Sequence, residues 1–142
     1  MPLRNFGSIL TFAAELEKAD KTFYAEAAEN PECSRYREML EGFSKQADKN
    51  LKLLLRARQE NVTEMILENI ENFTREPFIS SREDVRRFSA NEALAKIREL
   101  EEKASLFYAE ASERLKALPE VSRTLKSVEK RHRIQLEKAM GP

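Results

Sequence analysis

The sequence of 142 residues contains one cysteine, no tryptophan, three glycines and five prolines. With Cys33 alone, the chain forms no internal disulfide and no cysteine-based zinc or rubredoxin-type iron site. So few glycines and prolines argue against a turn-rich β fold, and the 35% of charged residues favours long helices. A chain of this length suits a single domain that buries a core without cross-links.

Net charge and long apolar runs are missing as well. The 25 basic residues balance 25 acidic ones, so nucleic acid and anionic membranes, which attract a basic excess, are not expected partners. No apolar stretch approaches the roughly 18 residues that indicate a membrane span. The first residues do not form a basic segment followed by an apolar run, as a secretion signal would. We therefore expect a cytoplasmic protein.

What the sequence does contain is helical periodicity. Apolar and small residues recur three and four positions apart along four segments, which predicts four amphipathic helices. Pro31 and Pro119 interrupt the pattern, because proline lacks an N–H donor and clashes with the preceding helical turn. We expect helices over about residues 6–29, 35–60, 89–118 and 121–139.

Residues 61–90 are too many for a hairpin turn between antiparallel neighbours. We expect a crossover that carries the chain to the other end of a bundle. Thr63 could cap a short helix within it, and this helix would cover the bundle or supply a dimer contact. Ser81 and Asp84 resemble a capping box for a further short turn.

Several polar residues fall within the apolar stripes and should therefore be buried. Glu17 and Asp20 share the inward stripe of the first helix, and Glu101 lies on that of the third. His132, the only histidine, lies on that of the fourth helix, with Glu129 one turn before it. Because an unpaired buried charge is costly, these residues need a metal ion or one another as partners.

The first and third helices repeat each other. Glu15-Leu16-Glu17 recurs as Glu99-Leu100-Glu101, and the sequence Phe-Tyr-Ala-Glu-Ala at 23–27 recurs at 107–111. Both matches have the same offset, since 101 − 17 and 108 − 24 are each 84. The chain therefore contains two related helical hairpins, which predicts an all-α four-helix bundle.

The second and fourth helices match more weakly. When Phe43 is aligned with Leu125, Ala47 falls opposite Glu129 and Asn50 falls opposite His132. We interpret residues 1–142 as one domain, with the first repeat at about 6–60, the crossover at about 61–90 and the second repeat at about 91–140.

Three motifs resemble those of the rubrerythrin family of the ferritin-like superfamily. They are Leu16-Glu17 seven residues before Tyr24, Leu100-Glu101 seven residues before Tyr108, and Leu125-x-x-x-Glu129-x-x-His132. The resemblance covers nearly the whole chain and implies a ferritin-like bundle that holds iron for peroxide reduction or iron oxidation. In that family, each hairpin supplies one Glu from its first helix and a Glu-x-x-His from its second, and together the two hairpins bind two iron ions.

The resemblance implies ligand roles for particular residues. Glu17, Glu101, Glu129 and His132 match the family's ligand positions. In addition, Tyr24 and Tyr108 match tyrosines that donate hydrogen bonds to ligand carboxylates.

The second helix departs from the family pattern. Ala47 has no donor atom, and the amide of Asn50 is a weak, neutral ligand. Asp20, one turn from Glu17, could partly replace the missing ligands. We therefore expect a reduced or asymmetric site with one iron ion, two or none. If the protein is active, we expect an oxidoreductase of the di-iron carboxylate type whose electron donor is unknown.

The residues leave three interpretations of the inward polar groups open. In the first, Glu101, Glu129 and His132 hold one metal ion or a weak pair, with Glu17 bridging. In the second, no metal is bound: His132 is protonated against Glu129 or Glu101, Asn50 bridges, and the tyrosine hydroxyls donate. In the third, these groups lie nearer to solvent. The corresponding functions are a non-haem redox protein and a metal-free bundle that serves as a binding or scaffold module, expected as a homodimer.

Overall fold

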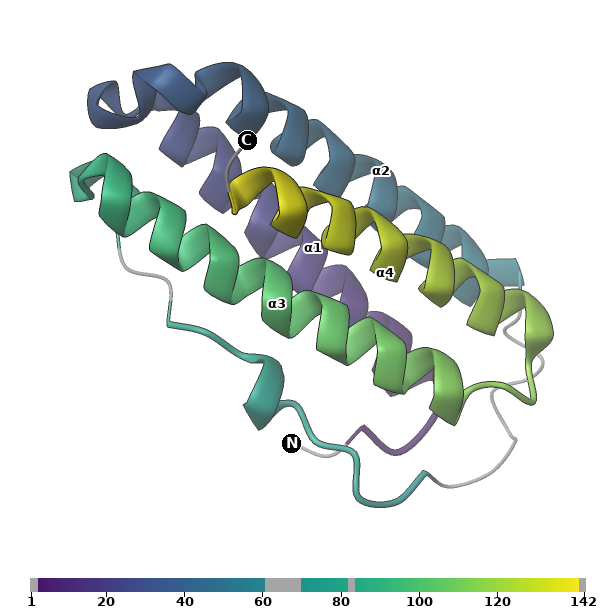
Figure 1. The fold of residues 1–142 in the computed structure, drawn as a ribbon. Helices are drawn as coiled ribbons and strands as arrows, with labels where there is room; N and C mark the ends of the chain where they lie inside the picture. The colour runs from purple at the N-terminus through teal and green to yellow at the C-terminus, as the bar shows by residue number, and fades with distance from the viewer. Residues whose placement is uncertain (1–2, 61–69, 82–83, 141–142) are drawn as a thin grey trace.

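The computed structural model describes residues 3–60, 70–81 and 84–140. Its main elements are the α-helices α1 (Phe6–Glu29), α2 (Arg37–Glu60), α3 (Ala90–Arg114) and α4 (Pro119–Ala139). α1 packs against α2 and α3 packs against α4, and the two hairpins lie side by side in one bundle (Figure 1). The all-α fold with two helical hairpins is thus confirmed.

Local sequence signals explain where the helices begin. Asn5 accepts a hydrogen bond from the backbone N–H of Ser8 (2.8 Å) at the start of α1, and the Ser8 hydroxyl oxygen accepts the N–H of Asn5. Ser89 and Glu92 form the same reciprocal arrangement at the start of α3, as their spacing indicates. Such capping boxes satisfy N–H groups that have no partner inside the helix.

Pro31 and Pro119 each begin a helix. Pro31 follows the end of α1 and begins a 3-10 helix, η1 (Pro31–Tyr36), so α2 begins two residues later than expected. Pro119 was expected to end the third helix, but α3 already ends at Arg114 and Pro119 is the first residue of α4. Proline is suited to this position because the first helical N–H has no intrahelical partner.

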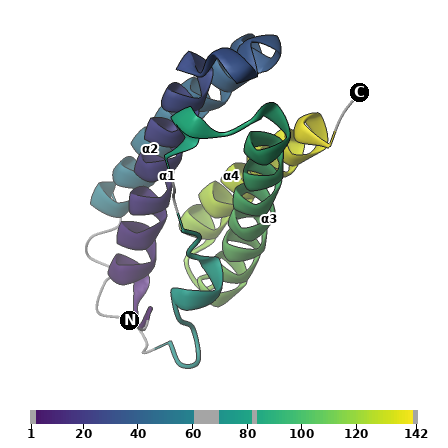
Figure 2. The same cartoon turned by 90° about the vertical axis from the view of Figure 1, so that its left-hand side faces the viewer.

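The described part of the connection between the hairpins, residues 70–81 and 84–89, runs from the end of the bundle near the N-terminus to the opposite end, where α3 begins (Figure 2). It contains the short 3-10 helices η3 (Glu76–Phe78) and η4 (Val85–Arg87). Asp84 caps η4 by accepting the N–H of Arg86 (3.1 Å), so Asp84 and not Ser81 is the capping residue. The helix expected to begin at Thr63 lies mainly in residues 61–69, outside the described residues.

The core consists of two apolar clusters. One surrounds Phe12 and Phe107, whose ring centroids are 5.2 Å apart, and the other surrounds Phe23 and Phe43. On α1 and α3, Glu17 and Glu101 fall between residues of the first cluster and residues of the second. The buried polar groups therefore form a layer across the middle of the bundle. Among the described residues, no helix is long and apolar enough to cross a membrane.

Candidate metal centre

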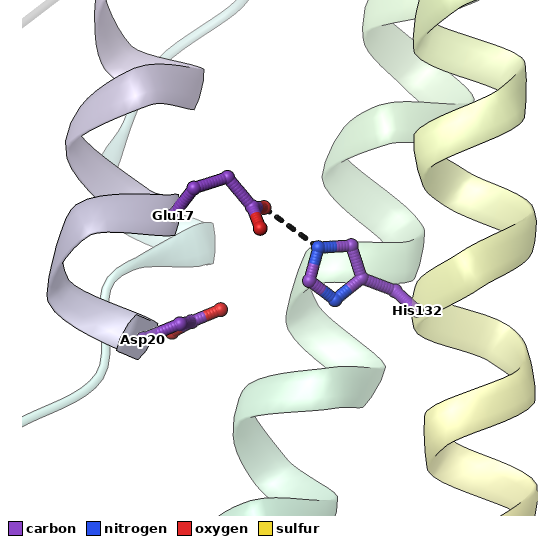
Figure 3. A group of neighbouring side chains, drawn as sticks. All are labelled: Glu17, Asp20 and His132. Carbon is purple, nitrogen blue, oxygen red and sulfur yellow. Dashed lines mark hydrogen bonds and ion pairs between the residues drawn. The ribbon is translucent and has the colours of Figure 1, made fainter. Parts of the chain in front are cut away.

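One imidazole connects the two hairpins inside the bundle. His132 on α4 is 1% exposed, and Glu17 on α1 and Glu101 on α3 are fully buried. The Nε2 atom of His132 lies 2.6 Å from Glu17 Oε2, and its Nδ1 atom lies 2.7 Å from Glu101 Oε2. Figure 3 shows His132 facing Glu17 from the opposite side of the bundle. Both nitrogens of the ring are therefore bound to carboxylates from different hairpins.

The two repeated tyrosines donate hydrogen bonds to these carboxylates, and each tyrosine reaches the carboxylate of the other hairpin. Tyr24 of the first hairpin donates its hydroxyl hydrogen to Glu101 Oε1 of the second hairpin. Tyr108 of the second hairpin donates to Glu17 Oε2 of the first, at 2.7 Å. The Tyr108 ring also stacks on His132, with centroids 5.3 Å apart and planes inclined by 12°. Each hairpin thus orients the carboxylate of the other.

Two amides supply the remaining donors. The Nδ2 group of Asn50 donates to Glu17 Oε1 (3.0 Å), and the Nε2 group of Gln135 donates to Glu101 Oε1 (2.9 Å). Asn50 Oδ1 in turn accepts from Gln46 (2.9 Å) and Arg131 (3.1 Å). We did not predict Gln135 from the sequence, although its place one turn after His132 was the available signal.

Burial and charge together determine the protonation of this layer. Burial alone would raise the pKa of Glu17, but the charge of His132 and hydrogen bonds from His132, Tyr108 and Asn50 lower it. Burial would lower the pKa of His132, but the charges of Glu17 and Glu101 raise it well above the usual value. Burial and nearby carboxylates raise the pKa of Tyr24 and of Tyr108, so both stay protonated. Without a metal, the layer therefore holds an imidazolium between two carboxyl groups.

Asp20 brings a further carboxylate to the same place. Asp20 is 3% exposed, and one ligand atom from each of Glu17, Asp20 and His132 lies within 4.8 Å of the others (Figure 3). Metal–ligand distances of about 2.0–2.2 Å place donor atoms at most ~4.4 Å apart, so small side-chain shifts would close the group around an ion. These residues form a buried cluster that could hold a metal ion.

The chemistry of the donors fits one divalent ion. Carboxylate oxygens and an imidazole nitrogen suit iron, manganese and zinc. Gln135 Oε1 is buried beside this layer without a hydrogen-bond partner among the described residues, which is unusual for a buried amide oxygen. A second ion has little support, because the side chain of Ala47 carries no donor atom and Asn50 already serves Glu17 and Arg131.

Glu129 lies apart from this cluster in the structure. Its Oε2 atom accepts a hydrogen bond from the Ser105 hydroxyl (2.9 Å) and lies 3.6 Å from Arg133 Nε, and its side chain is 19% exposed. Residues three apart on a helix differ by about 60° in direction. The shared face expected for Glu129 and His132 is therefore only approximate, and His132 alone points into the layer.

The structure separates the three interpretations in part. Glu17, Asp20, Glu101 and His132 are all buried, which excludes a solvent-facing cluster. The arrangement of His132, Asn50 and the tyrosines agrees with the metal-free interpretation, while the Glu17, Asp20 and His132 group agrees with a metal site.

Comparisons of this chain with models of known protein families, with curated proteins and with solved structures find no match.

Proposed function

We propose that the bundle binds one divalent first-row metal ion, iron in the first instance, through Glu17, Asp20 and the Nε2 atom of His132. The observation that carries this proposal is the convergence of these three fully enclosed groups, whose ligand atoms lie within 4.8 Å of one another. The set lacks Glu129 and so differs from the ligand set that the resemblance implies. Iron in such a site would supply electron transfer to peroxide or oxygen.

The charges of the layer favour a cation. Glu17 and Glu101 lie on either side of the His132 imidazole, and a ligand atom of Asp20 lies within 4.8 Å of ligand atoms of Glu17 and His132, so three acidic side chains gather around one basic group. A divalent ion that replaces the Nε2 proton would compensate more of this charge than the proton does. Buried ionised groups are costly without such compensation.

The other residues of the layer would hold the ligands in place. Glu101 accepts the Nδ1–H of His132, which leaves Nε2 free to bind metal, an arrangement common for histidine ligands. Tyr108 and Asn50 orient Glu17 by donating to its two oxygens. Glu101 therefore acts as a positioning residue for His132 in this proposal.

Metal analysis of the untagged protein tests the proposal. After chelation and anaerobic loading with Fe(II), Mn(II) or Zn(II), we expect about one ion per chain and a higher melting temperature. Asp20→Asn should weaken binding at least about tenfold, whereas Asp48→Asn, the same substitution at a partly exposed residue of α2 outside the cluster, should not. Less than about a tenth of an ion per chain, with unchanged melting temperature, would refute metal binding.

Redox activity is tested separately on the iron-loaded protein. We expect peroxide to oxidise the bound Fe(II), and stopped-flow absorbance measures this oxidation. Asp20→Asn should reduce the amount of iron oxidised in proportion to the iron that the variant fails to bind. Iron that stays reduced under excess peroxide would confine the function to metal binding.

A second function is favoured by a different observation. Both nitrogens of His132 and all four oxygens of Glu17 and Glu101 have hydrogen-bond partners without any metal. We propose as the alternative that this closed network joins the hairpins of a metal-free binding or scaffold module. In that case, chelation leaves the melting temperature unchanged, and Glu101→Gln lowers it equally with and without added metal.

A further inference from the structure

A groove of about 600 Å³ lies between α2 and α4, and its lining includes Gln135 of the buried polar layer but none of the proposed metal ligands. The chain runs in opposite directions in these two helices, and each supplies one wall of the groove (Figure 1). Its volume lies within the range of about 300–1,000 Å³ that is usual for small-molecule sites. The groove therefore has the size of a ligand site.

The groove carries an excess of positive charge. Arg35, Arg131 and Lys138, which we call the cationic rim, line it together with the single carboxylate of Glu38. None of the three cations forms an ion pair with a carboxylate in the part of the chain that the structure describes. Arg131 instead donates to the neutral oxygen of Asn50, and the Arg35 guanidinium lies 5.6 Å from the centroid of the Tyr36 ring. An anion is therefore the partner that the rim lacks.

Apolar side chains lie beside the rim. Met39 and Phe43 of α2 and Ile134 of α4 line the same groove, and Ile134 is 42% exposed. Apolar surface next to unpaired cations suits a molecule that has both an apolar body and a negative group.

Gly42 keeps the α2 wall of the groove open. It lies in the interior of α2, where glycine is about 1 kcal/mol less favourable than alanine. A Cβ atom at this position would meet no other atom within 4 Å, so close packing does not require a glycine there. A larger side chain at residue 42 would instead project from a residue that lines the groove.

We propose that this groove binds an amphipathic organic anion, a carboxylate with an aliphatic body. The carboxylate pairs with the cationic rim, and the aliphatic body lies against Met39, Phe43 and Ile134. None of the proposed metal ligands lines the groove, so the tests of anion binding and of metal binding can fail separately.

Calorimetric titration of the full chain with decanoate tests the charge requirement. We expect saturable binding that weakens as salt is added, because salt screens the rim. Decyltrimethylammonium, with the same alkyl chain and the opposite charge, should bind at least about tenfold more weakly. Lys138→Glu and Arg35→Glu change exposed residues and should each weaken decanoate binding several-fold. Equal binding of the two amphiphiles, or no saturable decanoate binding, would overturn the proposal.

A matched pair of substitutions at Gly42 tests the location. Gly42→Ala should bind decanoate within about twofold of the original chain, whereas Gly42→Leu should lose at least about tenfold, although both replace glycine with better helix formers. Melting temperatures at or above that of the original chain would show that both variants fold. Unchanged decanoate binding in Gly42→Leu would overturn the proposal.

Sedimentation of the same variants tests whether a second copy of the chain occupies the groove instead. Self-association that Gly42→Leu abolishes and decanoate does not reduce would assign the groove to a second copy of the chain, which also overturns the proposal.

Discussion

The first helices of the two hairpins share a buried glutamate and a buried tyrosine, whereas their second helices contribute different groups to the site. Glu17 and Tyr24 of α1 occupy the same places in the hydrogen-bond network as Glu101 and Tyr108 of α3, because each tyrosine donates to the glutamate of the other hairpin. α4, however, contributes His132 to the centre, whereas α2 contributes the neutral amide of Asn50. One imidazole thus contacts both of the similar carboxylates.

This difference shows how two equivalent carboxyl groups can be stabilised by a single side chain that comes from only one of the hairpins. An imidazole has two nitrogens on opposite sides of its ring, so a single residue reaches both carboxylates. Asn50 reaches only Glu17 and is itself bound by Gln46 and Arg131. We therefore expect matched substitutions in α2 and α4 to have unequal effects, and the matched changes Tyr24→Phe in α1 and Tyr108→Phe in α3 to have equal effects.

The largest effect is expected from His132→Leu. This change leaves two buried carboxyl groups without their cation and should lower the free energy of unfolding by about 3–5 kcal/mol. The matched change Asn50→Leu removes one donor to Glu17 and should cost about 1.5–3 kcal/mol. Urea denaturation with a chelator present measures both, and equal losses would contradict the asymmetry.

The next effect is the dependence of stability on pH. The pKa of His132 is raised in the folded protein, so its contribution is complete below its ordinary pKa of 6.5 and is lost as the pH rises through the folded value. The pKa of Glu17 is lowered, so its contribution is complete above 4.5 and is lost as the pH falls through the folded value. In a chelator, stability should therefore be greatest between about pH 4.5 and 6.5.

The control for this profile is again His132→Leu. Without the imidazole, the decline above pH 6.5 should largely disappear. A variant that retains the full decline would show that other groups cause it.

A smaller and symmetric effect is expected from Tyr24→Phe and Tyr108→Phe. Each removes one hydrogen bond to a buried carboxyl group, which is worth about 1.5–3 kcal/mol. The two losses, measured by thermal or urea unfolding, should agree within about 0.5 kcal/mol, a usual spread for equivalent changes. A clear inequality would show that the crossed tyrosines do not have equivalent roles.

The smallest effect is expected from Glu129→Gln. Because its carboxylate is partly exposed and contacts Ser105 and Arg133, its loss should cost under about 1 kcal/mol. Metal affinity should stay within about twofold of the original, since the side chain lies outside the Glu17, Asp20 and His132 group. A tenfold loss of affinity would restore Glu129 as a ligand, as the resemblance implies.

Much of the fold could be predicted from the chain alone. The stripe through Leu10, Ala13, Glu17, Asp20, Tyr24 and Ala27 is buried throughout, as helical periodicity requires. The boundaries were less accurate, because Pro119 suits the start of a helix as well as it marks the end of one. The direction of the Glu129 side chain could not be predicted either, because helical periodicity defines a face only to within several tens of degrees.

By itself, the sequence determined that four amphipathic helices pair as two related hairpins and that carboxylates and one histidine point inward. These properties follow from spacing along the chain, which local backbone geometry translates directly into faces. Only the tertiary structure decided that His132 lies between Glu17 and Glu101, that the tyrosines cross between hairpins, and that Gln135 completes the network. Those contacts join residues far apart in the sequence, so they depend on how the packed helices are rotated and placed against one another.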